Sequence, residues 1–130
     1  MLFRSAFAWA QRFGGTHSDA AYAVTVDPSD NILVTGTFWV DGDFGGGPLT
    51  SAGQGDVFVA KYTAPGAFVW AKRFGGAQDD SGRGIAVDGA GNVAVTGNFS
   101  GTAAFGTQTL TSSAGSADVF LSRLLASGSL

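Results

Sequence analysis

Cysteine and glutamate are both absent from this sequence, and charged residues make up only 13% of it. Without cysteine the chain has no disulfide and no thiolate ligand for a metal, which leaves its redox compartment open. All ten acidic residues are aspartate and 21 of the 130 residues are glycine, and both types favour turns over helices. We therefore expect an all-β protein.

Basic clusters and long apolar runs are missing as well. The net charge is −3, so we expect neither nucleic acid nor an anionic membrane surface as a partner. No apolar run approaches the ~20 residues that a membrane helix needs. The first ten residues carry a positive charge followed by apolar side chains, as signal peptides do. This stretch, however, belongs to a repeat and ends in Gln11-Arg12, so we do not interpret it as a leader.

The chain is a tandem duplication. FAWAQRFGG (7–15) recurs as FVWAKRFGG (68–76), and VDPSDNILVTGTF (26–38) recurs as VDGAGNVAVTGNF (87–99), both at an offset of 61 residues. After one inserted residue the offset becomes 62, and DVFVAKY (56–62) aligns with DVFLSRL (118–124). We therefore treat 1–130 as one unit with repeat 1 at 7–67 and repeat 2 at 68–129.

Each repeat contains four short segments with the apolar alternation of half-buried strands. The expected strands are 7–13, 21–27, 31–35, 56–62, 68–74, 84–88, 92–96 and 118–124. The glycine-rich stretch 39–55 is expected to be irregular. Four strands in about sixty residues match one blade of a β-propeller. The alternative is an eight-stranded sandwich or barrel closed within one chain.

A spaced pattern of residues recurs in both copies. In repeat 2 it consists of Asp80, Ile85-Ala86-Val87-Asp88, Gly91-Asn92, Val95-Thr96-Gly97, Phe99, Asp118-Val119-Phe120, Trp70 and Phe74-Gly75-Gly76. This pattern resembles the bacterial β-propeller repeats known as SBBP repeats, which are named for seven-bladed propellers. The resemblance implies a β-propeller with two four-stranded blades per chain. It also implies a parent protein that is exported or attached to the cell surface, and it assigns this chain itself to no compartment.

Two blades are too few to close a propeller ring within one chain. Because propellers hold 4–8 blades, identical two-blade chains can close at four, six or eight. We expect a ring closed by homo-oligomerisation, with a trimer favoured and a tetramer second. The N-terminal strand 7–13 is expected to complete the second blade of a neighbouring copy in trans.

Residues that recur in both repeats are interpreted as structural, because an active site needs no copy in every blade. They are the pairs Trp9 and Trp70, Asp19 and Asp80, Asp27 and Asp88, Gly36 and Gly97, and Asp56 and Asp118. The aspartates before hairpin turns are expected to accept hydrogen bonds from turn amides. The glycines are expected to end a strand through close backbone approach or a positive φ. For the tryptophans, packing against a blade is favoured over ligand stacking.

The candidate ligand site is the one place where the repeats differ in chemistry. Trp39, Asp41 and Asp43 in repeat 1 have no counterpart of the same type in repeat 2. A tryptophan beside two carboxylates in a glycine-rich loop suits a sugar ring and its hydroxyls. The competing interpretation is a tryptophan folded back onto its own blade. The two aspartates lack the third acid and the distal glutamate of a calcium loop, so we expect no metal site.

No catalytic residues and no cofactor are expected. His17 is the single histidine, and nothing in the sequence marks a partner for a zinc site or a catalytic triad. The interpretation is a non-enzymatic binding module, lectin-like in architecture, that binds carbohydrate or a surface protein and assembles with itself. The alternative is a purely structural or assembly module with no ligand of its own.

Overall fold

The computed structural model describes residues 6–130, and these residues form strands and turns without any helix. The strands are β1 (Asp19–Val26), β2 (Ile32–Asp43), β3 (Pro48–Tyr62), β4 (Phe68–Gly76), β5 (Asp80–Val87), β6 (Val93–Ser100), β7 (Thr102–Phe105), β8 (Gln108–Thr111) and β9 (Ala117–Leu124). Among the same residues no helix is long and apolar enough to cross a membrane.

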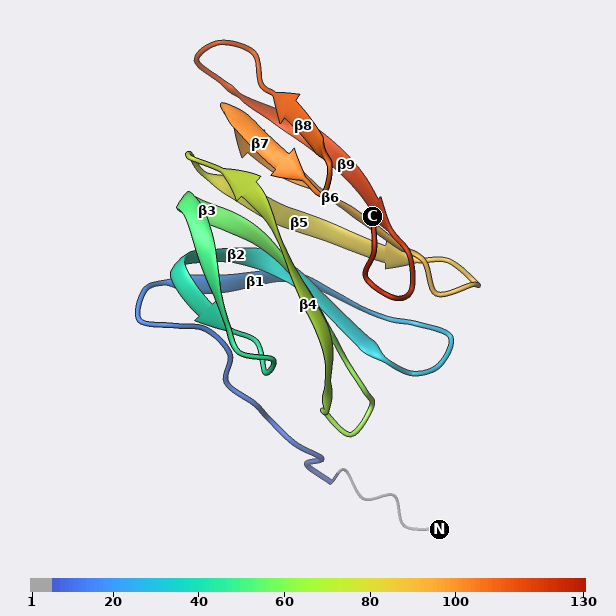
Figure 1. Ribbon diagram of the computed structural model, residues 1–130. Coiled ribbons are helices and arrows are strands. Elements are labelled where there is room, and N and C mark those ends of the chain that lie inside the picture. Colours follow the sequence, from blue (N-terminus) through green and yellow to red (C-terminus); the bar gives the residue numbers. More distant parts are fainter. Residues whose placement is uncertain (1–5) are drawn as a thin grey trace.

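The strands form two antiparallel sheets, one of six strands in the order β1-β2-β3-β4-β7-β8 and one of three in the order β5-β6-β9, so repeat 2 contributes strands to both (Figure 1). β1, β2, β3 and β4 lie side by side in chain order and make the first blade, here called blade 1. β5, β6 and β9 make blade 2 and are the repeat equivalents of β1, β2 and β3. Within residues 6–130, blade 1 thus has four neighbouring strands and blade 2 has three, and the expected supply of a fourth strand from another copy stays a prediction. Within residues 6–130, no fourth strand lies beside β9.

The stretch 39–55 was expected to be irregular, and this expectation is wrong. β2 continues to Asp43 and β3 begins at Pro48, so the two strands form an extended hairpin arm. A backbone ladder forms here without the side-chain alternation that marks a strand in the sequence. The equivalent arm of repeat 2 is the hairpin β7–β8, whose first strand pairs with the end of β4 and extends the blade 1 sheet to six strands.

Residues 7–13 form no strand within this single chain, and their expected pairing with a neighbouring copy stays a prediction. A strand requires a hydrogen-bonded neighbour, and the segment has only a single bridge at its end, between Gly14 and Asp43. The alternative, an eight-stranded sandwich or barrel closed within one chain, is also not formed. Both sheets of the described chain have free edges, with β1 and β8 bounding one and β5 and β9 bounding the other.

Two apolar clusters lie on the two faces of blade 1. The larger one fills the space between the blades, and its buried members include Leu33, Val57, Val59, Trp70, Phe74, Val93, Val95, Phe99, Phe120 and Leu124. The smaller one lies on the opposite face and comprises Phe38, Phe44, Phe58, Ala60 and Tyr62, with Phe13 packed against it. Alternate residues of a strand point to opposite faces, so the second half of β3 is buried on both sides. Burial on both faces is what a blade stacked between two others requires.

Candidate functional site

The junction between the blades is tied by a polar network around Asp27. Its carboxylate accepts hydrogen bonds from the backbone amides of Ser29 and Asn31, each at 2.9 Å, and so holds the β1–β2 turn. Lys61 Nζ lies 3.2 Å from Asp27 Oδ2, and both side chains are buried. Burial opposes ionisation of Asp27, but the hydrogen bonds from Asn31, Lys61 and Ser29 outweigh it and lower its pKa to about 2.

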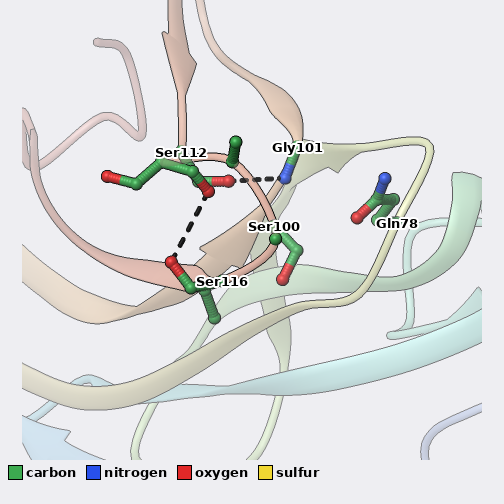
Figure 2. Close-up of a pocket in the computed structure, with 9 residues that line it drawn as sticks. Gln78, Ser100, Gly101, Ser112 and Ser116 are labelled. Carbon is green, nitrogen blue, oxygen red and sulfur yellow. Dashed lines mark hydrogen bonds between the residues drawn. The ribbon is translucent and has the colours of Figure 1, made fainter.

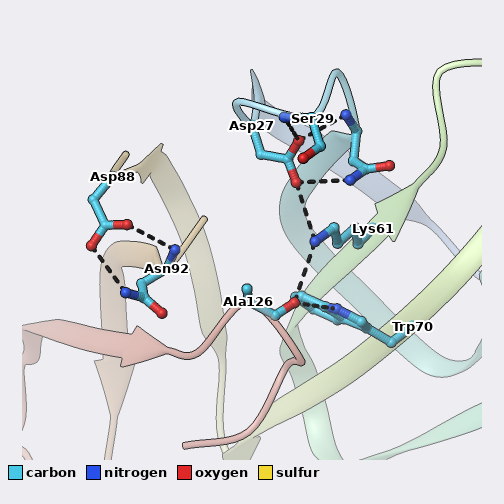
Figure 3. A network of polar contacts seen from close by, with 8 residues as sticks. Asp27, Ser29, Lys61, Trp70, Asp88, Asn92 and Ala126 are labelled. Atoms are coloured by element: carbon cyan, nitrogen blue, oxygen red, sulfur yellow. Dashed lines mark hydrogen bonds and ion pairs between the residues drawn. The ribbon is translucent and has the colours of Figure 1, made fainter. Parts of the chain in front are cut away.

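The same network reaches across to blade 2. Lys61 Nζ and Trp70 Nε1 both donate to the carbonyl oxygen of Ala126, at 3.3 and 3.2 Å (Figure 3). Ala126 belongs to the turn that follows β9. This turn therefore covers the Asp27–Lys61 pair and joins the two blades through two donors.

The repeat equivalent of this network in blade 2 is open to solvent. Asp88 accepts from the amides of Ala90 and Asn92, each at 2.9 Å, and Arg123 Nη2 lies 3.0 Å from Asp88 Oδ2. The hydrogen bonds from Asn92 lower the pKa of Asp88, as those in the first turn do for Asp27. No turn of the described chain covers Arg123, which remains exposed.

A second feature of the junction is a pair of buried carboxylates, Asp56 on β3 and Asp80 on β5. They lie on either side of Gly75: a Cβ there would be 2.7 Å from Asp80 Oδ2 and 2.8 Å from Asp56 Cγ. Arg73 Nη1 lies 2.7 Å from Asp56 Oδ2, whereas Asp56 Oδ1 is buried without a hydrogen-bond partner. Gly76 N donates to Asp80 Oδ2 at 2.8 Å.

These two carboxylates differ from Asp27 in the balance of burial and hydrogen bonding. Burial raises the pKa of Asp80 to about 6, despite the amides of Gly76 and Ser100, and the nearby charge of Asp56 raises it further. Burial also raises the pKa of Asp56, against the hydrogen bond from Ala52 and the charge of Arg73. Within residues 6–130, no three His, Cys, Asp or Glu side chains are grouped so as to hold a metal ion.

The recurring signature residues contact backbone in both repeats. A side chain at Gly36 or Gly97 would collide with the carbonyl oxygen of Ala20 or Ser81, and neither glycine has a positive φ. Close backbone approach is therefore the reason for glycine at both positions. The expectation that they end a strand is wrong, because Gly36 lies inside β2 and Gly97 inside β6. Asp118, the equivalent of Asp56, accepts from the Ser113 amide at 2.9 Å.

The structure separates the three residues of the candidate ligand site, because the chain bulges between Trp39 and Asp41. At the bulge Val40 has φ of 66°, an unusual conformation for a β-branched residue. Asp41 Oδ1 accepts from Thr16 Oγ1 at 2.9 Å, and Asp43 Oδ1 accepts from Gly45 N at 2.8 Å. Both carboxylates thus already hold loops.

Trp39 instead lines a cavity of about 380 Å³ with residues that were not predicted to form a ligand site. The cavity walls include His17, Asp19, Tyr22 and Thr37. Trp39 and Tyr22 are 37% and 45% exposed, and the Arg83 guanidinium lies 4.0 Å over the Tyr22 ring, so one face of that ring is covered. The sequence contained a clue to Tyr22, because this position differs in chemistry between the repeats. Repeat 2 has Arg83 in place of Tyr22, just as it has Ser100 in place of Trp39.

A second cavity, of about 340 Å³, occurs in repeat 2. It is lined by Gln78, Ser100, Gly101, Ser112 and neighbouring small residues, without an aromatic or charged side chain among them. Ser112 Oγ accepts from Gly101 N at 2.8 Å, which fixes one wall (Figure 2). The place in repeat 2 that corresponds to the Trp39 cavity therefore lacks its aromatic lining.

The largest difference between the repeats is the outer face of β9. Val57 and Val59 on β3 are 0% exposed, whereas their equivalents Val119 and Leu121 are 78% and 77% exposed. Large aliphatic side chains in adjacent outward positions of a strand are typical of an interaction surface. We call this surface, formed by Val119, Leu121 and Arg123, the open face of blade 2.

Comparison with known proteins agrees with the repeat architecture. The family model described as a beta-propeller repeat, SBBP, matches residues 8–42 and 69–98, which is half of the chain. An uncharacterized WD repeat-containing protein of Acanthamoeba polyphaga mimivirus is 30% identical over an alignment that covers 76% of this chain. The chain spans only 8% of that relative's length. With two copies of the motif in one chain, this protein belongs to the SBBP β-propeller repeat family.

Proposed function

We propose that the chain is a non-enzymatic propeller module that assembles with copies of itself, head to tail, into a closed ring. The observation that carries this proposal is the exposure of Val119 and Leu121 at positions where repeat 1 has fully buried residues. In repeat 1 those positions pack against the next blade. Because the repeats are equivalent, the open face of blade 2 suits another blade 1.

The complementary half of that interface lies on the outer face of blade 1. Val24 and Val26 on β1 are 65% and 56% exposed, whereas their equivalents Ile85 and Val87 pack against the core between the blades. Each copy thus carries two different, mutually fitting faces. Such a heterologous contact generates a ring when its rotation closes. We propose a trimer of six blades, with a tetramer of eight as the next candidate.

The proposal is tested by the mass of the assembly in solution, measured by native mass spectrometry at micromolar concentration. We expect the wild-type chain to form a closed oligomer. Leu121→Asp places a charge in the interface and should raise the concentration needed for assembly about 30-fold or more. A folded monomer as the wild-type species would overturn the proposal.

A matched control for this substitution is Thr109→Asp on β8. Thr109 is exposed, and so is its repeat equivalent Pro48, so this position is not buried in either repeat. Thr109→Asp should therefore leave assembly unchanged. Equal loss of assembly in both variants would indicate a general effect of added charge.

A second candidate function is carbohydrate binding in the repeat 1 cavity. It is favoured by the exposed ring of Trp39, which lines about 380 Å³ together with His17, Asp19 and Tyr22, one face of the Tyr22 ring being covered by Arg83. A sugar ring stacks on such faces while polar groups accept its hydroxyls. The test is a glycan screen in which Trp39→Ala should weaken any binding by about 2 kcal/mol or more. Asp43→Ala, which lies outside the cavity, serves as the control.

A further inference from the structure

Resting on this proposed function, we propose that residues 7–13 of one copy form the fourth strand of the neighbouring copy's blade 2. There they would pair with β9, and Arg12 would form an ion pair with Asp118 of that neighbour. The occupant of the open edge of β9 is thus a specific segment of a second copy of this chain.

The free edge of β9 is the first part of the argument. In blade 1, β3 lies between β2 and β4, with Val57 opposite Phe74 and Val59 opposite Lys72. In blade 2, β9 pairs only with β6 among the described strands. An unpaired edge beside exposed valine and leucine is a site for strand addition.

The N-terminal segment 7–13 contacts blade 1 of its own chain through the repeat equivalents of the residues that β4 uses to contact blade 2. Trp9 Nε1 donates to Ala64 O at 3.0 Å, as Trp70 Nε1 donates to Ala126 O at 3.2 Å. Gly66 lies against the ring of Trp9, as Gly128 lies against the ring of Trp70. These contacts are equivalent under the repeat offset, so the segment contacts blade 1 as β4 contacts blade 2.

The end of the segment repeats the same equivalence. Gly14 bridges Asp43 on the arm of repeat 1, just as Gly75 pairs with Ala104 on the arm of repeat 2. Gly15 N donates to Asp19 at 2.9 Å, matching the 2.8 Å bond from Gly76 N to Asp80. The segment therefore already has one of the two sets of contacts that β4 has. The contacts that the segment lacks are the backbone hydrogen bonds that β4 makes with β3. β9, the repeat equivalent of β3, lacks the same hydrogen bonds on its free edge.

The charges of the segment and of β9 are also complementary. Arg73 and Asp56 form an ion pair at 2.7 Å that joins β4 to β3. Their repeat equivalents are Arg12 and Asp118, and neither forms an ion pair with another described residue. Strand addition in the β3–β4 register would bring Arg12 to Asp118, and would place Phe13 opposite Val119.

The segment does not reach β9 of its own chain while these contacts hold. Phe13 packs on the cluster formed by Phe58 and Tyr62, on the face of blade 1 opposite to blade 2. Blade 1 therefore lies between the segment and β9. For this reason the β9 that receives the segment belongs to a second copy.

The test is a charge exchange at the proposed pair, read out as oligomer mass against concentration. Arg12 is exposed in the isolated chain, so Arg12→Asp should leave the fold intact, as judged by circular dichroism. We expect Arg12→Asp and Asp118→Arg each to raise the concentration needed for assembly about 30-fold or more. The double variant Arg12→Asp/Asp118→Arg should regain most of the loss. Thr109→Asp is the control for added charge.

The outcomes separate this inference from the proposed function. If Leu121→Asp abolishes assembly while Arg12→Asp does not, the ring stands and the trans strand is wrong. Failure of the double variant to recover assembly likewise overturns the Arg12–Asp118 pair. Fragments from neighbouring blades of a longer protein are the other possible occupant. Assembly that requires an added repeat fragment, and does not occur with the chain alone, would identify that occupant and overturn both proposals.

Discussion

β3 and β9 have closely related sequences, DVFVAKY and DVFLSRL, but opposite surroundings. The first is buried on both faces, whereas the second alternates between buried and exposed positions. The ion pairs follow the same division: Lys61 and Asp27 are buried at the junction, and Arg123 and Asp88 are exposed. The pKa of the aspartate is lowered in both turns, because the turn hydrogen bonds are present in both. The two repeats differ in whether a neighbouring blade buries the ion pair. The hydrogen bonds within the turn depend little on that neighbouring blade.

The largest expected effect is a loss of stability when a recurring glycine of the repeat, Gly36 or Gly97, is replaced. It should be the same in both repeats, because the contact that it disturbs lies within each blade. Gly36→Ala and Gly97→Ala would each force a side chain against a carbonyl oxygen of the adjacent strand. We expect each to lower the free energy of unfolding by about 3 kcal/mol. Denaturant titrations of both variants check this. Melting temperatures equal to that of the wild type would show that the backbone approach is not tight.

The next effect should differ between the repeats, because it depends on the neighbouring blade. Val57→Ala empties a buried position and should lower the free energy of unfolding by about 2 kcal/mol. Val119→Ala at the equivalent open position should cost less than about 0.5 kcal/mol in the dissociated chain. Denaturant titration below the assembly concentration measures both. Equal losses would contradict the difference in burial on which the comparison rests.

A third prediction concerns the carboxylates of the junction. The raised pKa of Asp80, about 6, means that the folded chain binds its proton more tightly than the unfolded chain, whose ordinary value is 3.8. This contribution to stability is full below about pH 4 and is lost as the pH rises through 6. Asp56, Asp79 and Arg73 are the charged groups around it, and the pKa of Asp56 is raised as well.

Stability should accordingly fall by about 1–2 kcal/mol between pH 4 and pH 6.5. Asp80→Asn cannot ionise and should flatten much of this slope, as thermal melts across that range would show. The equivalent Asp19→Asn serves as the control. A slope that is unchanged in Asp80→Asn would assign the titration to another group.

The smallest effect concerns the bulge, where the repeats differ in residue but not in geometry. Val40 has φ of 66° and its equivalent Gly101 has φ of 68°. Because a β-branched residue is strained there, Val40→Gly should raise the free energy of unfolding by about 1 kcal/mol. Val34→Gly on the same strand, where φ is not positive, should instead destabilise. Destabilisation by Val40→Gly would show that the packing of Val40 outweighs its strain.

The repeat made much of the fold predictable. Identical spacing placed the turns at Asp27 and Asp88 and the strands β3 and β9, because turn chemistry and apolar alternation are local properties. The extended hairpin arm within residues 39–55 was missed because backbone pairing in a glycine-rich segment leaves no alternation to detect. Residues 7–13 have the alternation of a strand but lack the neighbour that would make them one.

The candidate ligand site was predictable only in part. Trp39 was identified from the difference between repeats, but the bulge at Val40 turns it away from Asp41 and Asp43 and toward Tyr22. The bulge depends on the positive φ of Val40, and a valine in the sequence gives no indication of a positive φ. The loop 14–18, between the bridge at Gly14 and the start of β1, brings His17 to the same cavity, and no local pattern marks that approach.

Hydrogen exchange of β9 against β3 tests most directly whether the open face is half of an interface. At a concentration where the chain assembles, the amides of residues 118–124 should exchange as slowly as those of residues 56–62. On dilution below that concentration, exchange in β9 should accelerate while β3 stays protected. Fast exchange in β9 at every concentration, with β3 protected throughout, would contradict the account.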